Sequence, residues 1–329
     1  MAQSDHGRRR KGGNKPSVES AAYPRIPLAC YRLQFNKDLT FQKASEILEY
    51  LSRLGITDIY ASPLLQSRSG SQHGYDVTDP TRINAELGKE EQFDRFRAAL
   101  QEHGVGLLLD IVPNHMAANQ ENPWWMDVLE NGPGSAYAAY FDIDWHMPSL
   151  AIENKLLLPV LGRSYGQVLD NCELQLVFER GSFLIRYYDM FFPLAPKTYR
   201  RILKHREHIL EKRLGGNSPA FQEYLGIVAA LAALPEPESL TIDAAGERRL
   251  HIAGIKERLR QLDGSSREVK RFVSENLRIF NGRRGQVGTL RNLDRLLWDQ
   301  AYFLNYWQNV NEGIKFRWFF TIGSGGHAR

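Results

Sequence analysis

Two short polar blocks contain the residues whose types and spacing could do chemistry. The segment "SRSGSQHGYDVTDPTRIN" (67–84) holds almost no core-forming side chain, yet it follows the apolar run "GITDIYASPLL" (55–65). The block "DIVPNH" (110–115) closes a second apolar run. Imidazole, carboxylate, amide and phenol groups are hydrogen-bonding groups suited to a polar ligand. We therefore interpret both blocks as parts of one binding site at the ends of two strands.

Alternating strands and helices are predicted to position these blocks. Apolar runs predict strands at 27–35, 56–62 and 105–112, and amphipathic patterns predict helices at 40–55 and 89–104. This alternation favours a parallel sheet of right-handed βαβ units, either a (β/α)₈ barrel or a doubly wound sheet. No glycine-rich phosphate-binding fingerprint follows the first strand, which argues against a nucleotide-binding fold.

After residue 115 the pattern changes. The aromatic segment 120–132 predicts a loop, and 174–194 predicts a hairpin that turns at "RGS". Several helices are predicted between 197 and 310, with polar segments that indicate loops or short connections at 243–254 and 263–269. His205 and His208 stand three apart on one predicted helix. We interpret them as a solvated face and predict no metal, because a metal site needs more ligands.

Composition and charge limit the classes of protein to which this chain can belong. The chain has 329 residues, of which 43% are hydrophobic and 24% charged, as in soluble globular proteins. Much of the net charge of +4 lies in "GRRRKGGNK", so we expect a disordered basic tail over 1–24 rather than a nucleic-acid site. The longest apolar run (225–234) is shorter than the roughly 20 residues that cross a bilayer. We predict a cytoplasmic protein with no nucleic-acid or membrane partner.

The two cysteines do not form a disulfide framework in a chain of this length. Cys30 lies inside the first predicted strand, where we expect it to act as a small buried hydrophobic residue.

The two polar blocks, taken in order, resemble the α-amylase superfamily of retaining glycoside enzymes, whose third strand ends in a D-x-x-x-N-H block. Longer segments narrow the resemblance to the malto-oligosyltrehalose synthases. These segments are "YRLQF", "YASPLLQSRSGSQHGYDVTDPTRINAELG", "DIVPNHMA", "NPWWMDVLENGPGSAYAAYFDIDW", "LLLPVLGRSYGQVL" and "IRYYDMFFPLAPKTY". The resemblance covers residues 25 to 320, with a weaker middle from 205 to 270.

The resemblance implies a fold, an activity and a substrate. The implied fold is the N-terminal part of a (β/α)₈ TIM barrel, with three β/α units in 25–116 and a large, mostly helical insertion in 117–320. The implied activity is that of an isomerase, a (1→4)-α-D-glucan 1-α-D-glucosylmutase of trehalose biosynthesis. It converts the reducing-end α-1,4 link of a maltodextrin into an α,α-1,1 trehalosyl link. Maltodextrin is the implied partner, and no cofactor is implied.

The resemblance also implies roles for residues of the two blocks. A pyranose offers hydroxyl groups and flat C–H faces, so Tyr75 would stack on the sugar at the cleaved bond. His115 and Asn114 would bind that sugar or organise the site around it. Asp76 and Asp110 would hold the strand ends, the histidine and the tyrosine in place. For these two aspartates, structural hydrogen bonding to loop backbone is an equally open interpretation.

Three further residues belong to the implied site. His73 lies in the same block as Tyr75, and Trp124 and Trp125 would shape the glucan-binding wall. Core packing of the inserted region is the alternative for the tryptophan pair.

The catalytic carboxylates of the superfamily have no counterpart in this sequence. A retaining enzyme needs a nucleophile and an acid roughly 5 Å apart. The resembled family places its acids in a G-x-R-x-D-H block after strand four, on a glutamate after strand five and in an H-D block after strand seven. None of these blocks occurs here. We therefore expect a truncated chain without catalytic residues.

Residues 321–329 depart from the family pattern. Thr321 stands where an aspartate is expected, and "GSGGHAR" follows it. A frameshift would explain this, because the codons of 322–329, read one nucleotide later, can encode Ser-Gly-Leu-Ala-Gly-Met-Arg-Val. The downstream DNA should then encode the missing blocks.

Other functions stay open at this point. One is another α-glucan enzyme of the superfamily, such as a hydrolase. A second is a non-catalytic glucan-binding remnant, and a third is a non-functional product.

Overall fold

The structure, a computed structural model, describes residues 26–145, 155–236 and 242–308. The predicted tail 1–24 and the segment 321–329 lie outside the described residues. The chain divides into two compact units, of which the first contains 1–64 and 86–111 and the second contains 65–85 and 112–329. The predicted domain boundary at residue 116 stays a prediction.

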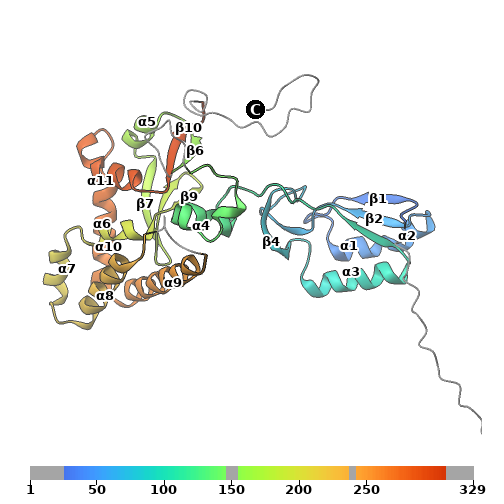
Figure 1. Ribbon diagram of the computed structural model, residues 1–329, viewed down its shortest axis with the longest axis horizontal. Coiled ribbons are helices and arrows are strands. Elements are labelled where there is room, and N and C mark those ends of the chain that lie inside the picture. Colours follow the sequence, from blue (N-terminus) through green and yellow to red (C-terminus); the bar gives the residue numbers. More distant parts are fainter. Residues whose placement is uncertain (1–25, 146–154, 237–241, 309–329) are drawn as a thin grey trace, which may run out of the picture. The chain divides into compact units, whose positions relative to one another are not determined.

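The first unit is a parallel three-stranded sheet with helices against it (Figure 1). The strands, in the spatial order β1-β2-β5, are β1 Cys30–Leu33, β2 Asp58–Ala61 and β5 Gly106–Leu109. The connecting helices are α1 Phe41–Glu46, α2 Leu48–Arg53 and α3 Glu90–Glu102. The predicted succession of parallel βαβ units is therefore confirmed. The predicted helix at 40–55 is divided at Ile47, where φ is −100° and ψ is 0°.

An aromatic cluster forms the core of the first unit. Phe41 at the start of α1 contacts Phe96 of α3 at 5.9 Å between ring centroids, and Phe35 contacts both rings at 5.8 Å. All three side chains are fully buried. The cluster joins the carboxyl end of the first strand to the helices α1 and α3.

The expected burial of Cys30 is wrong. Cys30 is an exposed free cysteine, and its neighbours Tyr31 and Arg32 in β1 are exposed as well. The reason is that β1 is the edge of the described sheet, so its apolar composition does not by itself bury it.

The described residues of the second unit form three small sheets. A hairpin joins β3 Leu65–Ser67 and β4 Val77–Ile83, and a meander joins β7 Leu174–Glu179, β8 Ser182–Tyr187 and β9 Met190–Pro193. The third sheet pairs two distant segments in parallel, β6 Leu156–Leu161 and β10 Tyr302–Tyr306.

Helices pack around the meander of the second unit, with α10 against β7 and α4 against β9 (Figure 1). Their bounds are α4 Pro123–Asn131, α5 Tyr165–Asp170, α6 Tyr199–Leu203, α7 Glu207–Leu214, α8 Pro219–Ala233, α9 Ile242–Ser265, α10 Arg267–Asn281 and α11 Val287–Trp298. Short 3₁₀ turns occur at Gly132–Gly134, Ala138–Tyr140 and Pro196–Thr198. Within the described ranges, no helix has both the length and the apolar composition that spanning a bilayer requires.

The predicted hairpin at 174–194 is confirmed, and β9 extends it to three strands. Its first turn places Arg180 at φ 50° and Gly181 at φ 83°. Two consecutive positive φ angles are what a two-residue type I′ hairpin turn requires, and glycine supplies one of them without steric cost.

Two predicted loops are helical instead, whereas the short connection predicted at 263–269 is confirmed. The segment 120–132 contains α4, because Asn122 caps the helix and Pro123 occupies its first position. The segment 243–254 lies inside α9, and 263–269 is the junction at which Ser266 caps α10. In both helical segments the helix buries an apolar face in the common core, and this tertiary packing outweighs the local polar residues.

The prediction for His205 is also wrong, whereas His208 is exposed on α7 as expected. His205 lies in the turn between α6 and α7 and packs edge-on against Phe280 at 5.4 Å between ring centroids. Burial, together with the neighbouring Arg206, lowers the pKa of His205.

Across the part of the chain that the structure describes, no group of three or more potential ligands is placed to hold a metal ion.

Candidate functional site

The polar loop 68–76 is held between the two strands of the first hairpin in the second unit. The Arg68 N–H donates to the Asp76 carbonyl at 3.0 Å, which closes the loop at the strand ends. Gly70 and Gly74 adopt φ angles of 74° and 77°. Glycine is the residue that takes such angles without strain, so the two glycines of this block allow the loop to turn twice within a few residues.

Asp76 organises the loop from inside. Its Oδ1 accepts a hydrogen bond from the Ser71 hydroxyl at 2.5 Å, and the same hydroxyl accepts from the Gly74 N–H at 3.1 Å. His73 Nδ1 accepts from the Tyr75 N–H at 3.0 Å, and the two rings stack with centroids 6.0 Å apart. These contacts favour the structural interpretation of Asp76, since one carboxylate oxygen is already engaged in shaping the loop.

His115 joins the two predicted blocks. Its Nε2 lies 3.0 Å from the Tyr75 carbonyl oxygen, and its Nδ1 lies 3.1 Å from the Asn114 amide oxygen. A carbonyl oxygen only accepts, so Nε2 must carry the hydrogen. Nδ1 faces the side-chain amide of Asn114, whose oxygen lies nearest to it. The structure thus brings His115 against Asn114 and the Tyr75 main chain, whereas the convergence of their side chains on one sugar stays a prediction.

Glu121 is a site residue that the sequence analysis missed. One of its carboxylate oxygens, Oε2, accepts from both the N–H and the hydroxyl of Ser69, each at 2.8 Å. A second tie is the Ala117 N–H, which donates to the Val77 carbonyl at 2.8 Å. The two loops are therefore also fastened at Ala117 and Glu121, both of which follow His115 in the chain. The sequence feature that could have indicated Glu121 is its position as an acidic residue shortly before Trp124 and Trp125.

Trp124 and Trp125 have different surroundings, which bear on the two roles considered for them, core packing and a glucan-binding wall. Both Trp124 and Trp125 donate backbone N–H groups to the Asn122 side chain, at 3.0 and 3.1 Å, at the start of α4. Trp125 packs against the hydrophobic core and contacts Phe141, which favours core packing. Trp124 instead stacks on Tyr137 with centroids 5.2 Å apart and an interplanar angle of 11°, beside the exposed Tyr140.

Asp110 belongs to the first unit, at the carboxyl end of its sheet. Its Oδ2 accepts from the Tyr60 hydroxyl at 2.9 Å and lies 3.5 Å from Arg32 Nη1. The Arg32 guanidinium also covers the Tyr60 ring at 5.1 Å. Arg32 and Tyr60, which the sequence analysis did not single out, therefore share one strand-end cluster with Asp110. Its convergence with Tyr75 stays a prediction.

Comparison with known proteins shows which proteins this chain, including the two polar blocks, is similar to. Residues 40–167 match the family model "Alpha amylase, catalytic domain". A Mycobacterium tuberculosis protein described as a maltooligosyl trehalose synthase is 39% identical over 182 residues, which are 53% of this chain and 22% of that protein. The resemblance to the malto-oligosyltrehalose synthases is confirmed. The chain thus spans about a fifth of the length of this relative.

Two further comparisons extend this likeness, one to a glycosyltrehalose synthase and one to an alpha-amylase. The solved DSM5389 glycosyltrehalose synthase superposes with a TM-score of 0.50 at 25% identity, over 85% of this chain and 27% of that one. The alpha-amylase SusG of Bacteroides thetaiotaomicron is 36% identical over 94 residues, 29% of this chain and 13% of that protein. The chain therefore contains part of an α-amylase-type fold, with mixed helices and strands.

Proposed function

We propose that this chain supplies the glucan-binding strand ends of a (1→4)-α-D-glucan 1-α-D-glucosylmutase. The observation that carries the proposal is the 39% identity over 182 residues to a maltooligosyl trehalose synthase. The activity is an isomerisation, in which the reducing-end α-1,4 link of a maltodextrin becomes an α,α-1,1 link.

The two polar blocks would bind one sugar ring. The Tyr75 ring provides the flat surface, and His115, fixed by the Tyr75 carbonyl and Asn114, provides hydrogen-bonding capacity beside it. Asp76 and Glu121 hold the loops, while Asp110 holds the strand ends of the first unit. Trp124, with the exposed Tyr140 beside it, would extend the glucan surface. His73 would support the Tyr75 ring through stacking.

The finer architecture belongs to the proposal as well. The three parallel strands of the first unit would be the first three of a (β/α)₈ barrel, and 117–320 would be an insertion after the third strand. The barrel explains why β5 is rich in leucine on both faces, since a barrel strand is covered from inside and outside. We also place the protein in the cytoplasm as part of this proposal.

Affinity electrophoresis of the full 329-residue chain tests the binding role. The chain should be retarded in a gel containing maltodextrin and should run normally in one containing dextran, whose links are α-1,6. Tyr75→Ala should remove most of the retardation, because stacking on the sugar is lost. Tyr188→Ala, at a tyrosine that is 69% exposed and outside the site, is the matched control. Equal retardation of both variants would refute the proposed role of Tyr75.

A hydrolase of the same superfamily is the second candidate, favoured by the match to the alpha-amylase SusG. That match is about half as long as the one to the maltooligosyl trehalose synthase. Product analysis on an intact homologue separates the two functions. The proposal expects trehalosyl-ended glucans, whereas free glucose or maltose as main products would favour the hydrolase.

A further inference from the structure

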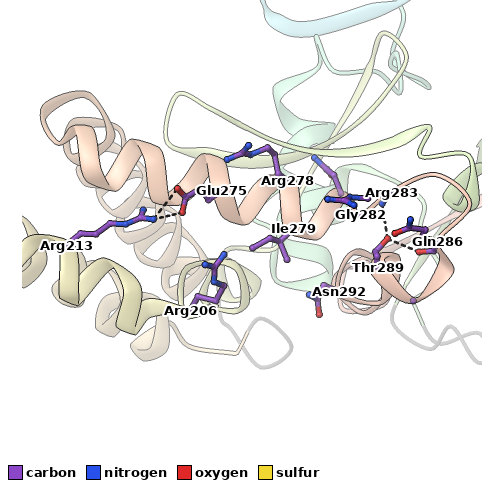
Figure 2. A pocket seen from close by; sticks show the side chains of 12 residues that line it. Arg206, Arg213, Glu275, Arg278, Ile279, Gly282, Arg283, Gln286, Thr289 and Asn292 are labelled. Atoms are coloured by element: carbon purple, nitrogen blue, oxygen red, sulfur yellow. Dashed lines mark hydrogen bonds and ion pairs between the residues drawn. The ribbon is translucent and has the colours of Figure 1, made fainter.

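An arginine-rich cavity in the second unit plays no part in the proposed glucan site. Its volume is about 930 Å³, within the range of roughly 300–1,000 Å³ typical of small-molecule sites. Its walls come from the turn before α7, from α7 and α10, and from the start of α11 (Figure 2). Four arginines line the cavity, whereas Glu275 is the one acidic residue among its described lining residues. The arginines are Arg206, Arg213, Arg278 and Arg283.

The charges of this cavity are not balanced within the described chain. Glu275 accepts two hydrogen bonds from Arg213 Nη2, at 2.9 and 3.2 Å, and one from Arg271 at 3.0 Å. Its single negative charge is thus already shared by two guanidinium groups. Arg206, Arg278 and Arg283 form no ion pair with any residue that the structure describes. The cavity therefore carries a net positive charge that a bound anion would neutralise.

Two features of individual arginines also indicate a ligand. Arg213 Nη1 is buried and has no hydrogen-bond partner among the described residues. A buried N–H without an acceptor is costly, and such groups occur mainly where a ligand, ion or water completes them. Arg206 adopts the left-handed backbone conformation, with φ 61° and ψ 28°. A non-glycine residue held there is strained, and such strain concentrates at ligand-binding positions.

The wall formed by the turn between α10 and α11 presents neutral polar groups. The Thr289 hydroxyl accepts from the Arg283 N–H at 2.8 Å and donates to the Gln286 carbonyl at 2.7 Å (Figure 2). Gly282, at φ 61°, leaves no room for a side chain, because a Cβ there would approach the Thr289 carbonyl oxygen to 2.9 Å. These contacts stabilise the turn between α10 and α11 and hold the main chain of Arg283 at the cavity.

We propose that this cavity binds a phosphate group, either free or carried by a small molecule such as a sugar phosphate or a nucleotide. Guanidinium groups match phosphate with paired, charge-assisted hydrogen bonds, and several around one cavity favour a doubly charged group over a carboxylate. The volume leaves space for a sugar or nucleoside beside the phosphate. This inference is independent of the proposed glucan function and concerns different residues.

Titration calorimetry tests it with the full 329-residue chain, expressed as a fusion with a neutral solubility partner. The ligands are orthophosphate, glucose 6-phosphate and ATP, with glucose and adenosine as uncharged counterparts. At least one phosphate compound should bind saturably, and neither uncharged compound should compete with it. Tighter binding of glucose 6-phosphate or ATP would assign the site to the corresponding phosphorylated molecule. Equal binding of all three would assign it to the phosphate group alone.

Variants locate the binding to this cavity. The double variant Arg206→Gln/Arg283→Gln should weaken phosphate binding by about tenfold or more, because two charge-assisted contacts are lost. Arg278→Gln, at an exposed helix position where folding is not at risk, should weaken it in the same direction. Arg267→Gln, exposed on the same helix α10 but outside the cavity, should change nothing. Absence of saturable binding, or full affinity in both cavity variants, would overturn the proposal.

Discussion

Gly181 shows at the residue scale how closely the second unit is packed. It lies in the turn between β7 and β8 at φ 83°, and a Cβ added there would stand 2.0 Å from the Lys256 carbonyl oxygen of α9. Both the backbone conformation and the space exclude a side chain. The hairpin turn can therefore contact the helix only because this residue is glycine.

Gly181→Ala should lower the free energy of unfolding by roughly 2 kcal/mol or more, from backbone strain and overpacking together. Urea titration followed by circular dichroism measures this change. Gly254→Ala is the matched control, since Gly254 lies inside α9 with nothing near its missing Cβ. That variant should stabilise by about 0.5–1 kcal/mol, because alanine favours the helix. Identical urea midpoints for the two variants would contradict the prediction.

A second residue-scale prediction concerns His115. It compares a variant that loses the hydrogen-bond donor with one that loses only the imidazole ring. His115→Ala removes the hydrogen bond to the Tyr75 carbonyl and should weaken maltodextrin binding roughly threefold to tenfold. His115→Gln can still donate to that carbonyl and should keep more of the affinity. Affinity electrophoresis over a range of maltodextrin concentrations gives both values. If the alanine variant binds as well as the glutamine variant, the contact to Tyr75 does not organise the site.

At the element scale, a buried ion pair fastens helix α4 to helix α9. Lys256 Nζ lies 2.5 Å from Glu130 Oε1, with 23% and 11% of the two side chains exposed. Burial raises the pKa of Glu130 above its usual value near 4.5, and the Lys256 charge partly offsets this rise. Since α4 carries the tryptophan pair, this ion pair also helps to position Trp124.

Lys256→Met should destabilise the second unit by about 3–5 kcal/mol at neutral pH, because it leaves the Glu130 carboxylate buried without its partner. The pKa of Glu130 then rises further above its unfolded value. The penalty is therefore fully present at pH values above the folded pKa, fades as the pH falls through the unfolded pKa near 4.5, and is absent below it, where the carboxyl is protonated in both states. Hydrogen–deuterium exchange of α4 and α9 at pH 5 and pH 8 measures it.

The double variant Glu130→Gln/Lys256→Met provides the control for this pair. It contains no carboxylate at position 130, so its destabilisation should be smaller than that of Lys256→Met and nearly independent of pH. Equal loss of protection at pH 5 and pH 8 in the single variant would refute the proposed protonation of Glu130.

Exposed apolar surface governs behaviour at the scale of the whole molecule. Leu109 of β5 is 54% exposed and the following Ile111 is 68% exposed, while Leu28 before β1 is 84% exposed. Neither β1 nor β5 has a second neighbour among the described strands, so each offers an open edge. Unpaired strand edges with apolar side chains are templates for association.

We therefore expect the isolated chain to dimerise through an open edge, to aggregate or to bind chaperones. The double variant Leu109→Lys/Ile111→Lys should raise the soluble monomer fraction by placing charge at the β5 edge. Size-exclusion chromatography with light scattering measures that fraction. A monodisperse monomer of the unmodified chain, with one sharp thermal transition, would contradict the prediction.

Turnover is the remaining whole-molecule prediction. Purified 329-residue chain should not convert maltodextrin to a trehalosyl-ended product, because the positioning groups Tyr75 and His115 cannot replace a nucleophile and an acid. Removing catalytic groups from a working site typically costs several powers of ten in rate. Chromatography of the sugar products after long incubation checks this. Product above a trace would show that the chain contains catalytic carboxylates outside the expected blocks.

The sequence by itself determined the three parallel strands, the hairpin at 174–194 and the position of the two polar blocks at strand ends. These features follow from local periodicity, from glycine at positions of positive φ and from side-chain chemistry at strand ends, all of which are properties of neighbouring residues.

Only the tertiary structure decided the exposure of Cys30, the core position of Trp125, the parallel pairing of β6 with β10 and the arginine cavity. In each case the outcome depends on segments distant in the chain. Cys30 is exposed because its strand is at an edge, and the four arginines line one cavity because α7, α10 and α11 pack together. Burial and convergence are properties of packed surfaces, which a local pattern does not encode.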